Sequence, residues 1–78
     1  MTGAQFANLL NKLGVSVDDV AERAGISRDH LYKFRRGERG LGDEYQTHLR
    51  ETLLLIGRER LQDLHDATLE SMEEALSR

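Results

Sequence analysis

A tight turn between two very short apolar-patterned segments restricts the fold of this chain more than any other feature. Residues 17–24 and 28–36 each show helical periodicity, but neither is long enough to be stable as an isolated helix. Between them, Gly25 supplies the backbone freedom for a turn, and Ala21 is small enough for a second helix to cross closely. The angle between the two segments would be filled by Ile26, Leu31 and Phe34. The pattern is typical of a helix-turn-helix over residues 17–36.

Helical spacing of apolar residues continues through nearly all of the chain, and no segment alternates as a strand would. Proline is absent, which suits a helical protein. Glycines divide the pattern, and Gly57 is expected to kink or break the last part. The sequence therefore predicts an all-α fold of five short helices, at about residues 3–13, 17–24, 28–36, 44–56 and 58–77.

The chain has 78 residues, enough for one domain only. We expect residues 1–57 to form the helix-turn-helix part and residues 58–78 to form an amphipathic helix of the same domain. Cysteine is absent, no apolar run is long enough to span a membrane, and no signal peptide is visible at the N-terminus. These features favour a cytoplasmic protein with no membrane partner.

Charge is distributed unevenly along the chain. Residues 1–40 contain seven basic and five acidic side chains, whereas residues 41–78 contain four basic and nine acidic ones. The net charge of −3 argues mildly against a nucleic-acid binder. The asymmetry, however, indicates two surfaces with different partners.

The segment VDDVAERAGISRDHLYKFRRG, residues 17–37, resembles the lambda-repressor/Cro-like family, also called the XRE family. With the helices on either side, the resemblance covers about residues 3–56. It implies that the helix after the turn lies in the major groove of DNA. Two features depart from the family pattern: Val17 stands where many members have Gln, and Gly-Leu-Gly-Asp precedes the fourth helix where a Pro or Ser-rich start is common. The resemblance depends on Val20-Ala21, Ala24-Gly25-Ile26-Ser27, Leu31, Phe34 and Gly37.

The side of residues 28–36 that faces away from Leu31 and Phe34 carries the candidate DNA-binding residues. Long cationic side chains can donate to guanine O6 and N7, and a carboxylate can accept from cytosine. Hydroxyl and guanidinium groups can hold phosphates. The candidate base-reading residues are Arg28, Asp29, Tyr32 and Lys33, and the candidate phosphate-binding residues are Ser27, Arg36 and Arg39. Alternatively, the cluster is a solvated or protein-binding face, Asp29 is an ion-pair partner, and Tyr32 is half-buried packing.

The last expected helix has a broad apolar face opposite an acidic one. Two interpretations stay open: the helix folds back to close the core, or it pairs with its copy across a two-fold axis. A dimer would present two recognition helices about 34–36 Å apart, one turn of DNA. The candidate dimer-interface residues are Leu54, Leu55, Leu61, Leu69, Met72 and Leu76.

The sequence thus predicts a bacterial or phage transcription regulator, a repressor or autoregulator that binds a palindromic operator in double-stranded DNA as a homodimer. The alternatives are a protein-interaction module, binding a regulator or polymerase through the acidic C-terminal helix, and a phage or toxin–antitoxin accessory protein. His30, His48 and His65 lack the spacing of metal ligands, and the first two are expected to be packing residues. We expect no enzymatic activity, metal or cofactor.

Overall fold

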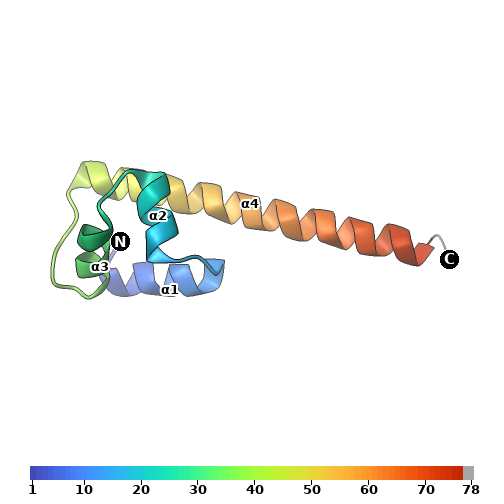
Figure 1. Cartoon of the computed structure of the whole chain (residues 1–78), viewed down its shortest axis with the longest axis horizontal. Helices are drawn as coiled ribbons and strands as arrows, with labels where there is room; N and C mark the ends of the chain where they lie inside the picture. Colours follow the sequence, from blue (N-terminus) through green and yellow to red (C-terminus); the bar gives the residue numbers. More distant parts are fainter. Residues whose placement is uncertain (77–78) are drawn as a thin grey trace.

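The described residues form four helices: α1 (Gly3–Leu13), α2 (Val17–Ala24), α3 (Arg28–Arg35) and α4 (Asp43–Leu76) (Figure 1). The structure, a computed structural model, describes the backbone of residues 1–76 and the side chains of residues 1–75. The side chain of Leu76, a candidate interface residue, lies outside the described part. The all-α fold is confirmed, but the division into five short helices is wrong, because the last two are one helix of 34 residues.

Gly57 lies inside α4 and does not break it. The glycines that do end helices, Gly14 and Gly25, adopt left-handed backbone angles with φ of 66° and 69°. Gly57 has no positive φ. A glycine weakens a helix by about 1 kcal/mol relative to alanine but removes no hydrogen bond, so helix-forming neighbours on both sides can carry the helix through it.

Replacing Gly57 with alanine is expected to stabilise the protein by about 1 kcal/mol, because alanine is the better residue in a helix interior. A Cβ atom there would lie 3.7 Å from Leu13 Cδ2, an ordinary van der Waals contact. Urea unfolding of Gly57→Ala, followed by circular dichroism, measures the change. The reverse exchange at an exposed site of the same helix, Ala67→Gly, should destabilise; a Gly57→Ala protein less stable than the parent would contradict the prediction.

Helices α1 and α2 pack against the first half of α4, and α3 packs against α1 and α2; together they form a compact part, which we call the head (residues 1–57) (Figure 1). Phe6, Leu31 and Leu49 are fully buried at its centre, and the Phe6 and Phe34 rings lie 5.8 Å apart. The expectation that His48 is a packing residue was wrong, because His48 is exposed. The other buried residues among those described are Leu10, Val17, Val20, Ala21, Ile26, Phe34, Thr52, Leu53 and Ile56.

An ion pair joins α2 to α4 where the head ends. Arg23 donates two hydrogen bonds to the Glu59 carboxylate, at 2.8 Å and 2.6 Å. These bonds hold the pKa of Glu59 below its ordinary value and raise the pKa of Arg23. The pair adds a contact between α2 and α4, whose direction beyond the head follows from its being one continuous helix.

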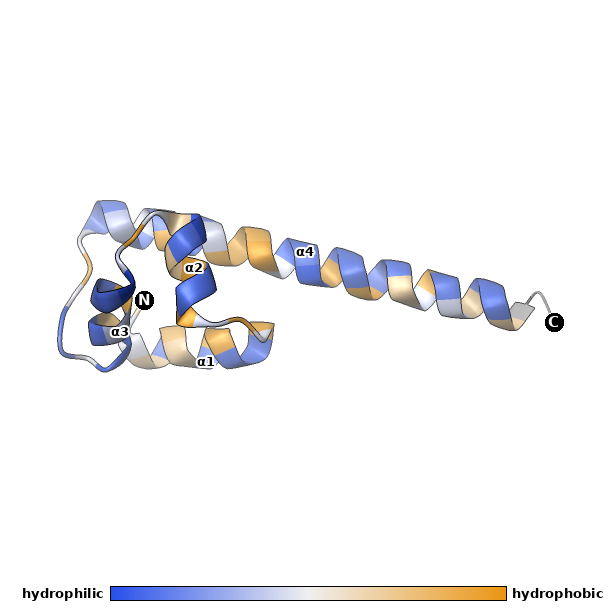
Figure 2. Ribbon diagram, in the orientation of Figure 1, coloured by the Kyte–Doolittle hydropathy of each residue, from blue (hydrophilic) through white to orange (hydrophobic). Residues whose placement is uncertain are grey.

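Beyond the head, α4 continues as a projecting rod, which we call the stalk (residues 58–76) (Figure 1). Every residue from 58 to 75 is exposed, so the stalk does not fold back onto the core. The molecule consequently measures 56 × 19 × 18 Å. Hydrophobic and hydrophilic residues recur in bands along the whole stalk (Figure 2). Within the described residues, no helix combines the length and apolarity that crossing a bilayer requires.

Candidate nucleic-acid interface

Helix α3 is held at a defined angle by local features on both sides of the turn. Gly25 is left-handed, and its N–H donates to Ala21 O, which ends α2. The next residue, Ile26, is buried and also donates its N–H to Ala21 O, at 3.1 Å. Ser27 then begins α3 by accepting a hydrogen bond from His30 N at 3.3 Å. Leu31 is buried on the inner side, so the opposite side of α3 faces solvent.

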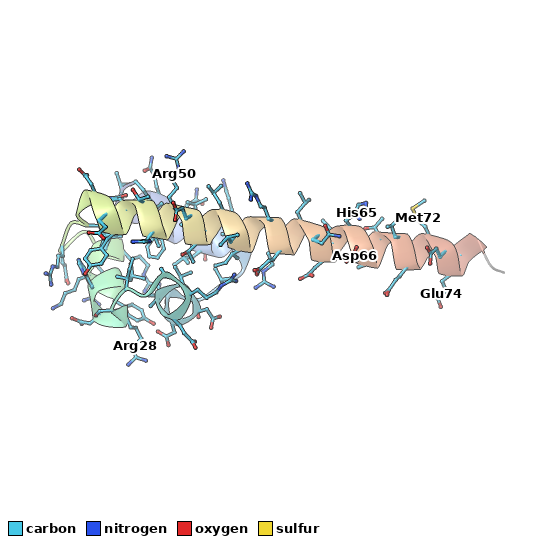
Figure 3. The ribbon with its side chains drawn as sticks, turned by 90° about the horizontal axis from the view of Figure 1, so that it is seen from above. Arg28, Arg50, His65, Asp66, Met72 and Glu74 are labelled. Atoms are coloured by element: carbon cyan, nitrogen blue, oxygen red, sulfur yellow. The ribbon has the colours of Figure 1, made fainter. Side chains whose placement is uncertain are left out.

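Arg28 is the most exposed basic side chain among the ion pairs of this face, at 69%. Its Nη1 lies 3.7 Å from Asp18 Oδ2, at the first turn of α2. Figure 3 shows Arg28 pointing away from the molecule on the side opposite Arg50. Such a weak exposed pair leaves the guanidinium available to a ligand.

The aromatic ring of Tyr32 packs against the core and does not project into solvent from the outer side of α3. Tyr32 is partly buried against the core, and its hydroxyl donates to Asp18 Oδ1 at 3.2 Å. The guanidinium carbon of Arg35 lies 5.1 Å from the centre of the ring, in a cation–π contact. Of the two interpretations of Tyr32, the geometry favours packing. Its hydroxyl and Arg28 meet the same carboxylate, so Asp18 links both to α2.

Two further cations on the outer side of α3, Lys33 and Arg36, form ion pairs with solvent-exposed carboxylates. Lys33 Nζ lies 3.1 Å from Asp29 Oδ2, and Arg36 Nη2 lies 3.0 Å from Glu38 Oε2. Every side chain in the two pairs is at least 42% exposed. Pairs of this kind contribute about 0–1 kcal/mol and are screened by salt, so a phosphate or a base edge can replace the carboxylate. Asp29 is thus an ion-pair partner in this structure.

Ser27 and Arg39 border the face at its two ends. The Ser27 hydroxyl accepts a hydrogen bond as the helix cap, and its own hydrogen can still be donated. Arg39 is exposed in the loop after α3 and makes no ion pair within the part of the chain that the structure describes. All seven residues expected to contact DNA therefore lie on or beside α3, with Tyr32 the least accessible to a ligand.

Two residues of this surface were not anticipated from the sequence. Asp18 lies in the first turn of α2, where an acidic residue suits the helix dipole. Arg35 was not assigned a role, although its spacing of three residues from Tyr32 places both on one side of α3. That spacing was the available signal for Arg35. For Asp18 there was none, because its partners come from the next helix.

Among the described residues, no group of three or more His, Asp or Glu side chains gathers as a metal site would require. We found no family model, no curated protein and no solved structure that matches this chain. Two surfaces of the protein stand out as candidates for a function: the outer side of α3 and the stalk.

Proposed function

We propose that the protein is a sequence-specific DNA-binding regulator and that the outer side of α3 enters the major groove. The observation that carries the proposal is the α3 face itself. Arg28, Lys33 and Arg36 extend from one short helix whose opposite side is buried, and only exposed carboxylates compete for them. A rigid cationic helix of this kind matches the width and charge of the groove.

The roles divide by position on the face. Arg28 stands in the first turn of α3 and presents two donors, which suits the O6 and N7 atoms of a guanine. Lys33, one turn further on, can donate to a second base once Asp29 releases it. Arg36 and Arg39 lie at the end of α3 and beyond it, where they suit phosphates. Base contacts would then supply sequence preference and phosphate contacts would supply affinity.

The resemblance of residues 17–37 to the lambda-repressor/Cro-like family agrees with this assignment. The left-handed glycine at the turn and the serine cap of α3 are compatible with a helix-turn-helix. A regulator of this family type would repress or autoregulate transcription by occupying its operator, and a homodimer would read a palindrome.

A salt titration of binding to random duplex DNA tests the proposal. The logarithm of the affinity should fall linearly with the logarithm of the salt concentration, with a slope of about −2 per head from Arg36 and Arg39 alone. Fluorescence anisotropy with a labelled duplex provides the measurement. Selection of bound duplexes from a random pool should then enrich one consensus. A complete lack of affinity for duplex at low salt would refute DNA binding.

The second candidate function is a protein-interaction module. It is favoured by the stalk, which exposes large apolar side chains and carries five acidic residues between positions 63 and 74. In that case the random duplex would not bind at any salt concentration, and selection would enrich nothing.

A further inference from the structure

Asp18 of α2 contacts two side chains of α3 at the same time. Its Oδ1 accepts a hydrogen bond from the Tyr32 hydroxyl at 3.2 Å, and its Oδ2 lies 3.7 Å from Arg28 Nη1. Arg28 and Tyr32 are four residues apart and therefore lie on one side of α3, in successive turns. The Asp18 carboxylate thus lies between them, held from the neighbouring helix.

Tyr32 restrains this carboxylate more than an exposed ion pair alone would. The Tyr32 ring packs against the buried core of the head, and the guanidinium carbon of Arg35 lies 5.1 Å from the centre of the ring. A ring held on both sides keeps its hydroxyl in place, and the hydroxyl in turn restrains Asp18. Within the described residues, the other carboxylates of the face, on Asp29 and Glu38, each contact only the cation that they pair with.

Arg28 keeps most of its donors free while it lies beside Asp18. A guanidinium has five N–H groups, and here a single nitrogen approaches the carboxylate. The Arg28 side chain is 69% exposed, and Figure 3 shows it pointing away from the molecule. The guanidinium can therefore reach a base edge without leaving the neighbourhood of Asp18.

The Asp18 carboxylate affects the two kinds of DNA group that Arg28 could bind in different ways. Guanine presents O6 and N7, which are neutral acceptors, whereas each backbone phosphate is an anion. A phosphate paired with Arg28 would bring its negative charge close to the carboxylate, and the juxtaposition of like charges weakens binding. A neutral base edge meets no such repulsion.

We propose that Asp18 is a specificity-determining residue of the α3 face, which orients Arg28 toward a base and disfavours its contact with phosphates. It is a positioning residue, because it acts through Arg28 and need not contact DNA itself. The inference rests on the proposed DNA-binding function and deepens it. Arg39 forms no ion pair within the described residues, so no carboxylate restricts it in this way, which suits its assignment to phosphates.

Binding of two duplexes to full-length Asp18→Asn tests the selectivity. Asparagine keeps a carbonyl oxygen for the Tyr32 hydroxyl but carries no charge. Affinity for random duplex should rise about fivefold, the scale of one like-charge contact in water, whereas affinity for the selected duplex should not rise. The salt slope on random duplex should steepen by about one unit, because Arg28 is then free to pair with a phosphate. Fluorescence anisotropy measures both quantities.

Glu51→Gln is the matched control, because it removes one exposed negative charge from α4 rather than from α2. It should change the affinities for the two duplexes by the same factor. If Asp18→Asn also changed both affinities by one common factor, the inference would be wrong although the protein binds DNA. A parent protein that binds neither duplex would refute the DNA-binding proposal and this inference with it.

Nitrogen-15 relaxation of arginine side chains tests the orientation in the absence of DNA. Arg50 is the internal reference, because it is exposed on a helix and forms no ion pair within the described residues. The heteronuclear NOE of the Nε–H group should be higher for Arg28 than for Arg50 in the parent protein. In Asp18→Ala it should fall to the Arg50 value, and in Tyr32→Phe it should fall part of the way. Equal values for the two arginines in the parent protein would overturn the proposal.

Discussion

Gly3→Ala is expected to destabilise the protein by about 2–3 kcal/mol. A Cβ atom at this position would collide with the carbonyl oxygen of Phe34 and lie 2.9 Å from that of Arg35. Both obstacles are backbone atoms, which cannot rotate away as a side chain can. The start of α1 and the end of α3 would have to separate, disturbing the packing of Phe6 on Phe34.

The loss is measured by thermal unfolding, where 2–3 kcal/mol corresponds to a fall in Tm of about 10–20 °C for a domain of this size. Gly40→Ala is the matched control, because no atom lies within 4 Å of a Cβ there and its φ is not positive. A Gly3→Ala protein as stable as the Gly40→Ala protein would mean that α1 and α3 are not in close contact at this point.

Local sequence features are enough to explain where most helices of the head begin and end. Ser16 and Ser27 cap their helices, and the glycine after α2 is left-handed, because each of these features depends on neighbouring residues only. The capping box at Thr2 formed for the same reason. The close approach of Gly3 to α3 could not be predicted, since it joins residues more than thirty positions apart.

In α4, two local sequence signals conflict: a glycine that predicts a helix end and flanking residues that favour a helix. Gly57 is the kind of residue that often marks a helix end. Good helix-forming residues lie on both sides of it, however: Leu54, Leu55 and Ile56 before it and Arg58 to Leu61 after it. No capping geometry ends the helix at this point. A glycine ends a helix where it adopts a left-handed conformation that turns the chain, and Gly57 does not adopt that conformation. The expected interface residues Leu54, Leu55, Leu61, Leu69 and Met72 are all exposed.

The sequence predicted the location of the candidate DNA-binding face better than the role of each residue on it. Leu31 and Phe34 mark the buried side of α3. The opposite side was therefore predicted to be exposed, and it carries every cation of α3 that we propose to contact DNA. The pairing of Tyr32 and Arg28 with Asp18 could not be predicted, because it depends on how α2 crosses α3. If α3 binds DNA as we propose, Asp18 would compete with the DNA for Arg28 and would orient the guanidinium before binding.

Arg28→Ala is expected to weaken binding to the selected DNA site by about 1–3 kcal/mol, a loss of roughly 5- to 150-fold, and to relax preference at one base pair. The reason is geometric: Arg28 projects from the first turn of α3 with two donors, and the replacement leaves the matching base acceptors unpaired. Arg39→Ala should weaken selected and random DNA about equally and flatten the salt slope by about one unit per head. Anisotropy titrations on both duplexes measure the two effects.

Lys12→Ala is the matched control, because it removes one exposed positive charge from α1 rather than from α3 and so separates a local contact from the change in net charge. Helicity is compared for all three variants, which have substitutions at exposed positions and should fold as the parent does. If Arg28→Ala kept the full sequence preference while Arg39→Ala altered it, the groove and backbone roles would be exchanged. If both variants bound as Lys12→Ala does, the α3 cluster would be a solvated face and the interaction module would replace the DNA-binding proposal.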